Sequence, residues 1–196
     1  YAYLNKRRAL DIQRALDQLD SKTWVWNGDG FSEIGNVISC ETPFDCRPYL
    51  FSLPAEIRMF ARMFNQLGMQ SQLTADMLVN ILQRIKSASE AMHHDATFQQ
   101  RNLLMCINVL NLLAEKLGEA NEDLQSQIVV PIEVKGSGIL CLKPIQECTY
   151  SDKEWLQQRS KYFGQEKMEA SHTFINSSIP PETAKALNVP DRKSVV

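Results

Sequence analysis

The chain of 196 residues lacks any run of about 18 or more consecutive apolar residues, which a membrane-spanning helix would need. Its most apolar region, Leu103 to Leu117, is interrupted by Asn108, Asn111 and Glu115. We therefore expect no membrane partner. A surplus of basic charge is also absent, because 21 basic and 23 acidic residues leave a formal net charge of -2. Since nucleic-acid binding requires cations to neutralise phosphates, this balance argues against a nucleic-acid partner.

The cysteines lack any pattern of a disulfide framework or a zinc site. Their number is odd and no Cys-x-x-Cys occurs, which favours free thiols in a reducing compartment. Cys106 lies within an apolar helical stripe, where a small hydrophobic residue is more expected than a nucleophile. The five are Cys40, Cys46, Cys106, Cys141 and Cys148.

Signatures of nucleotide binding and of catalysis are also missing. Gly28-x-Gly30 and Gly136-x-Gly138 lack the residues that complete a phosphate loop, so we interpret both as hairpin turns. His93-His94-Asp95 lies in a polar stretch between helices and is predicted to be exposed to solvent. The sequence thus predicts no ATP binding, no cofactor, no metal and no catalytic residue. A hydrolase stays open as an alternative, which a pocket joining a histidine to a cysteine or aspartate would support.

The overall composition is that of a folded globular chain. Hydrophobic residues make up 44% and charged residues 22% of it, which disfavours disorder. We expect one module over residues 1–190 and a severed linker over 191–196. Because the chain begins with Tyr1 and has no apolar signal segment, we interpret it as a piece of a longer polypeptide.

Apolar residues recur at helical spacing in several segments, most of them bounded by capping signals. Pro54 and Gly68 delimit one helix, and Thr74 can cap the next. Ser151 and Glu154 have the spacing of a capping box, and Tyr150 and Trp155 flank them as a hydrophobic staple, so a helix should begin at 151. Six helices are expected, at residues 9–19, 54–67, 74–89, 97–117, from 151 onward and 180–187.

Two segments have the character of β-strands. Trp24-Val25-Trp26 leads into a turn at residues 27–30, and the strands at 128–132 and 139–142 should form a hairpin whose Pro131 marks an edge. The predicted fold class is therefore α+β and mainly helical: about six helices around the one at 97–117, with one small antiparallel sheet built from the strands near 24 and the hairpin.

The aromatic residues Trp24, Trp26 and Phe31 are the candidate interaction residues. Two tryptophans spaced two apart on a strand project from the same face. We expect this face to fill a core against the helices. The alternative is that it contacts another domain or a bound polypeptide, as large aromatic side chains do at binding hot spots.

Several of these segments, in the same order, resemble the repeat modules of the sacsin family of very large chaperone-like proteins. The chain has Leu187-Asn188-Val189 where that family commonly has Leu-Gly-Val, and Asp152-Lys153-Glu154-Trp155 where it has Asp-Ala-Pro-Trp. Both departures keep residues that can cap the ends of the predicted helices. The resemblance is carried by residues 24–31, 48–54, 67–68, 139–144, 150–156, 179–180 and 184–189.

The resemblance implies a portion of a repeat that follows a GHKL-type ATPase domain, with the ATP-binding residues outside this chain. It further implies a cytoplasmic co-chaperone whose partners are neighbouring repeat domains, the heat-shock chaperone machinery and unfolded clients. We therefore expect a non-catalytic structural and interaction module. The alternative is a client-peptide-binding domain that uses the Trp24/Trp26 face.

Overall fold

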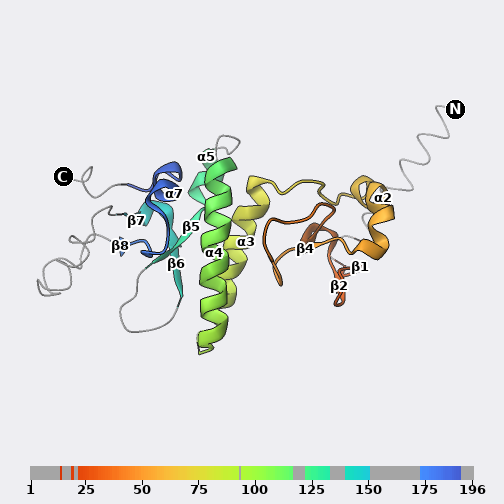
Figure 1. The fold of residues 1–196 in the computed structure, drawn as a ribbon, viewed down its shortest axis with the longest axis horizontal. Helices are drawn as coiled ribbons and strands as arrows, with labels where there is room; N and C mark the ends of the chain where they lie inside the picture. Colours follow the sequence, from red (N-terminus) through yellow and green to blue (C-terminus); the bar gives the residue numbers. More distant parts are fainter. Residues whose placement is uncertain are drawn as a thin grey trace, which may run out of the picture. The chain divides into compact units, whose positions relative to one another are not determined.

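The computed structural model describes residues 14, 19, 22–92, 94–116, 122–132, 140–150 and 173–190 (Figure 1). The contacts divide the chain into two compact units, unit 1 over Tyr1–Leu73 and unit 2 over Thr74–Val196. The single module expected over residues 1–190 stays a prediction, and the expected linker at 191–196 lies outside the described residues.

Unit 1 consists of short elements. Its strands form two sheets of two strands each, with β1 and β2 antiparallel and β3 and β4 parallel. A 3-10 helix, η2, leads directly into the short helix α2. The elements are β1 (Val25–Trp26), β2 (Phe31–Ser32), η1 (Ile34–Asn36), β3 (Val37–Ile38), β4 (Phe51–Ser52), η2 (Ala55–Phe60) and α2 (Ala61–Gln66).

One hydrophobic cluster holds unit 1 together. It takes one residue from each of β1, β3 and α2 and others from the loops beside them. Trp24 and Ile57 pack against it from the start of the hairpin and from η2. Gly68 follows α2 with a φ of 104°, the left-handed cap that the sequence predicts. The buried members are Val25, Val37, Leu53, Phe64 and Met69.

Unit 2 is built on two long helices. The longest, α4, contacts α3, β5 and α7 and is central to the packing of this unit, whereas the sequence predicted a central place in the fold as a whole (Figure 1). The elements are α3 (Ala75–Ala91), α4 (Ala96–Lys116), α5 (Glu122–Ser126), β5 (Val129–Ile132), β6 (Cys141–Pro144), η4 (Ile145–Glu147), β7 (Cys148–Thr149), β8 (Thr173–Phe174) and α7 (Pro181–Ala186).

The helix boundaries of unit 2 follow local signals. Thr74 caps α3, since its Oγ1 accepts a hydrogen bond from the backbone N–H of Met77 at 3.4 Å. Asp95 caps α4 in the same way, accepting from the N–H of Phe98 at 3.0 Å. After α7, Asn188 adopts the predicted left-handed conformation with a φ of 57°. The helix α3 ends at Ala91 rather than near Ser89.

The prediction of an α+β, mainly helical fold is confirmed, but the expected single sheet is wrong. Among the described strands, β1 pairs with β2 in unit 1 and β5 with β6 in unit 2, each antiparallel and in separate sheets. Two parallel pairs, β3–β4 and β7–β8, were not predicted. Local patterns do not encode which strands meet, because each hairpin packs on the core of its own unit.

The helix count also differs from the six expected. The described residues contain five α-helices, of which α5 lies between the predicted helix at 97–117 and the predicted strand at 128–132, where no helix was expected. The helices expected at 9–19 and from 151, with the Ser151/Glu154 capping box and the Trp155 staple, lie outside the described residues except for Arg14 and Leu19. Within the described ranges, no helix combines the length and hydropathy needed to cross a bilayer.

All five cysteines are free, and burial separates them into two groups. Burial raises the pKa of the Cys106 thiol to about 12 and those of Cys46 and Cys148 to about 11. Because the thiolate is the reacting species, iodoacetamide at pH 8 should alkylate Cys40 and Cys141 quickly and the other three only after unfolding. Mass spectrometry of the labelled chain would measure this. Alkylation of Cys106 in the folded chain as fast as Cys40 would contradict it.

Candidate interaction surface

The β1–β2 hairpin presents an aromatic pair to solvent. Val25 is 1% exposed and fills the core, whereas Trp26 is 39% and Phe31 62% exposed. Trp26 and Phe31 are cross-strand partners, with ring centroids 5.5 Å apart at 67° in an edge-to-face arrangement. Such pairs contribute roughly 0.5–1.5 kcal/mol beyond the area they bury, so the two rings stabilise one another while both stay partly accessible to solvent.

Trp24 is placed differently from Trp26, which corrects the expectation that both tryptophans fill a core. Trp24 is half-buried and packs against the unit 1 cluster, with its ring 6.0 Å from that of Phe64. Its indole Nε1 is buried and has no hydrogen-bond partner among the residues that the structure describes. The core therefore takes Trp24 and Val25, while Trp26 stays outside with Phe31.

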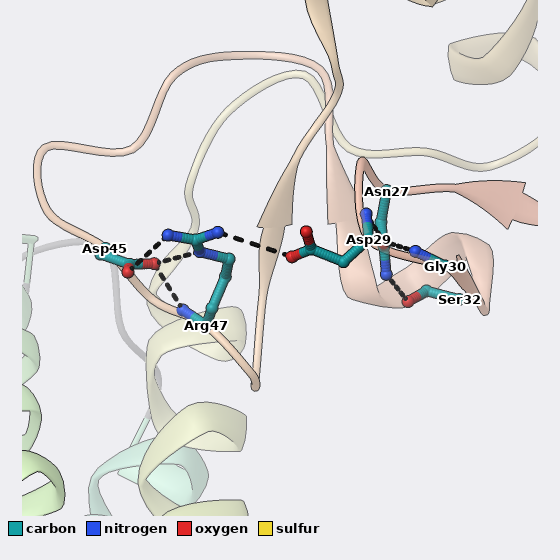
Figure 2. Close-up of polar contacts among 6 residues, drawn as sticks. All are labelled: Asn27, Asp29, Gly30, Ser32, Asp45 and Arg47. Carbon is teal, nitrogen blue, oxygen red and sulfur yellow. Dashed lines mark hydrogen bonds and ion pairs between the residues drawn. The ribbon is translucent and has the colours of Figure 1, made fainter.

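The turn between the two strands is closed by Asn27. Its Oδ1 accepts hydrogen bonds from the backbone N–H groups of Asp29 at 3.0 Å and Gly30 at 2.8 Å, and its Nδ2 donates to Ser32 Oγ at 2.6 Å (Figure 2). Gly28 has a φ of 102°, a conformation that glycine adopts without strain. These contacts confirm the predicted turn and fix the strand ends that carry the aromatic pair.

Arg47 ties the turn to the loop that follows β3. Its guanidinium donates to both carboxylate oxygens of Asp45, at 2.9 and 3.0 Å, and lies 3.5 Å from Asp29 Oδ2 on the hairpin (Figure 2). The hydrogen bonds and charge of Asp45 raise the pKa of Arg47. The sequence does not indicate this role of Arg47, because its two partners come from separate loops.

A second exposed apolar set lies on η2 and α2. Met59 is 79%, Phe60 48% and Met63 46% exposed. The sequence predicts one helix over residues 54–67, and the structure divides this segment into η2 and α2. The segment begins as a 3-10 helix, so the spacing of residues around its axis differs from that of one continuous α-helix.

The residues considered for catalysis are not assembled into a site in the described parts of the chain. Cys106 is fully buried in α4, which agrees with a packing role, and His94 is exposed as predicted. His93 lies outside the described residues. Within the described ranges, no group of three or more His, Cys, Asp or Glu residues could hold a metal ion. The hydrolase alternative therefore gains no support from the described geometry.

Comparison with known proteins gives one similarity. No family model and no solved structure matches the chain. Human sacsin is 30% identical over 133 residues, which cover 66% of this chain but 3% of sacsin. The chain thus corresponds to a very small part of that protein. This match supports the resemblance found in the sequence: the chain is similar to a short segment of sacsin.

Proposed function

We propose that this chain is a non-catalytic structural and interaction module of a large sacsin-like, cytoplasmic co-chaperone. In this proposal it follows an ATPase domain, and its partners are neighbouring repeat domains. The observation that carries the interaction role is the exposed Trp26–Phe31 pair on a braced hairpin. The similarity to a segment of human sacsin supports the chaperone context.

The geometry of the hairpin suits a contact surface. Aromatic side chains are enriched at binding hot spots because they bury a large area for few lost rotamers. Here the turn is closed by Asn27, and the Arg47–Asp29 ion pair holds it from the side. A partner would therefore meet a surface that is largely ordered before binding, which lowers the entropic cost of association.

The second candidate function is direct binding of unfolded client peptides by the same hairpin. The exposed Met59, Phe60 and Met63 in the same unit favour it, because methionine adapts its shape to varied apolar partners. The two candidates differ in the partner and share the surface. The experiment below separates them by using two probes.

We expect the double change Trp26→Ser with Phe31→Ser to leave the chain folded, with a melting temperature lowered by no more than about 6 °C, because Phe31 is 62% and Trp26 39% exposed. The double variant should bind at least about tenfold more weakly to the adjoining segments of the full-length protein, or to a reduced and unfolded α-lactalbumin probe. Calorimetric melting and fluorescence anisotropy measure the two effects.

Two further variants serve as controls. Leu104→Ser removes a 62% exposed leucine from α4 and should change neither stability nor binding. Trp24→Ser should lower the melting temperature, because Trp24 packs on the core. If the double variant loses binding to the adjoining segments but not to the unfolded probe, the chain is a scaffold module. If it loses binding to the unfolded probe but not to the adjoining segments, the chain is a client-binding domain. Full binding of both probes by the double variant would refute an interaction role for this hairpin.

A further inference from the structure

We propose that the outer face of the β1–β2 hairpin binds an arginine side chain carried by a partner polypeptide, through Trp26, Phe31 and Glu33. This inference deepens the proposed interaction function and rests on it. It assigns the partner a chemistry: an apolar segment that carries a guanidinium group.

The extended backbone at Glu33 is compatible with a place on the same face as Phe31. Glu33 directly follows β2 and has an extended backbone, with φ of -64° and ψ of 148°, so the alternation of side chains continues through it. Burial agrees with this alternation, because Phe31 and Glu33 are exposed and Ser32 between them is 8% exposed. Trp26 lies beside Phe31 as its cross-strand partner.

The register places the two rings close together. Asn27 N–H donates to the carbonyl oxygen of Gly30 at 3.0 Å, so these two residues face each other as a hydrogen-bonded pair. The next pair along the ladder, Trp26 with Phe31, is therefore a non-hydrogen-bonded pair, in which side chains approach most closely. The proposed site thus combines this compact aromatic surface with the carboxylate of Glu33.

The carboxylate of Glu33 is not used within the described part of unit 1. Glu33 occupies the N-cap position of η1, yet its side chain makes no capping hydrogen bond. The ion pairs described there join Arg47 to Asp29 and Asp45, and Arg58 to Glu41. None of the described ion pairs uses Glu33, so its negative charge is available to a cation of a partner.

An aromatic pair beside a carboxylate is complementary to a cation. The face of an indole or phenyl ring is electron-rich and attracts a cation within about 6 Å of its centre, and tryptophan does so most strongly. A guanidinium is planar, so it can stack on a ring while its N–H groups donate to a carboxylate. Lysine offers a point charge without the stacking plane, and an acidic side chain would be repelled by Glu33. The charge pattern therefore favours arginine.

The test uses the whole 196-residue chain and four labelled ten-residue peptides. The peptides share alternating leucine and serine positions and differ at two central sites, which are both Arg, both Lys, both Gln or both Glu. Fluorescence anisotropy should show the Arg peptide binding about threefold more tightly than the Lys peptide and at least about tenfold more tightly than the Glu peptide.

Glu33→Gln should weaken binding of the Arg peptide about three- to tenfold and leave the Gln peptide unchanged. Glu56→Gln, which neutralises an exposed carboxylate on η2 in the same unit, is the matched control and should change nothing. Circular dichroism spectra would verify that each variant is folded. Equal affinities for the Arg and Gln peptides, or an unchanged Arg affinity in Glu33→Gln, would overturn the inference.

The failure of this inference is distinguishable from failure of the proposed function. If peptides bind without regard to charge and the Trp26→Ser/Phe31→Ser variant loses all of them, the interaction surface stands and the arginine preference is wrong. If the double variant binds every peptide and both probes as the parent does, the interaction surface itself is wrong, and the inference falls with it.

Discussion

Replacing Gln99 with methionine should lower the free energy of unfolding by about 3 to 5 kcal/mol, since two buried polar groups and one part-buried carbonyl lose their partner. Gln99 is 2% exposed in α4. Its Nε2 donates to the carbonyl oxygens of Ser89 at 3.0 Å and Met92 at 2.9 Å, and its Oε1 accepts from the N–H of Leu140 at 3.0 Å. One side chain thereby joins the end of α3, the start of α4 and the residue before β6.

Methionine has nearly the size of glutamine, so this variant tests hydrogen bonding rather than volume. The neighbouring Gln100 is exposed on the same turn of α4, and Gln100→Met should change stability by less than about 0.5 kcal/mol. Urea unfolding followed by circular dichroism would measure both. Equal, small effects at the two positions would show that water satisfies the groups and that Gln99 is not a structural centre of unit 2.

The second large effect is expected at Leu110, which is fully buried where α4 contacts its neighbours. Leu110→Ala should cost about 3 to 4 kcal/mol, because it removes apolar contacts and leaves a cavity in a packed core. Leu104→Ala on the same helix, at a residue 62% exposed, should cost less than about 0.5 kcal/mol.

The two leucines make a matched pair, because both substitutions change the intrinsic helix propensity by the same amount. The difference between their unfolding free energies therefore reports burial alone. Thermal and urea unfolding of the two variants would measure it. A difference below about 1 kcal/mol would show that α4 does not form the packed centre of unit 2.

Local signals in the sequence predicted local structure well. Thr74, Gly68 and Asn188 act at single helix ends, where the chemistry of one residue decides the backbone conformation. The Asn27-Gly28 turn was predictable for the same reason. Each of these predictions depends on residues within about four positions of one another, and each is confirmed.

Non-local pairing was not predictable in this way. No sequence pattern within residues 24–32 or 128–144 indicates that their hairpins belong to separate sheets. Gln99 has the same ambiguity: a polar residue in an amphipathic helix is normally assigned to the outer face, and its burial becomes favourable only through its hydrogen-bond partners. Ser89 and Met92 precede the helix by a few residues, but Leu140 is 41 residues away, and the sequence pattern does not show that it comes near.

The candidate site was predictable in part: its aromatic residues were predicted, but the side that each faces was not. Trp24, Trp26 and Phe31 were identified from residue type and spacing alone, but a strand that reads aromatic, apolar, aromatic does not reveal which face meets the core. The structure shows that Val25 does so, and that Trp24 packs on the same cluster while Trp26 does not. No sequence feature of Glu33 by itself indicates a binding role, because its proposed role depends on Phe31 and Trp26.

The central claim is that the Trp26–Phe31 face is an exposed binding surface, and hydroxyl-radical footprinting read by mass spectrometry tests it most directly. In the free chain, Trp26 and Phe31 should be oxidised several times faster than the half-buried Trp24. Addition of the adjoining segments or of the unfolded probe should protect Trp26 and Phe31 and leave Trp24 and Leu104 unchanged. Slow oxidation of Trp26 in the free chain, or equal rates with and without either partner, would contradict the account.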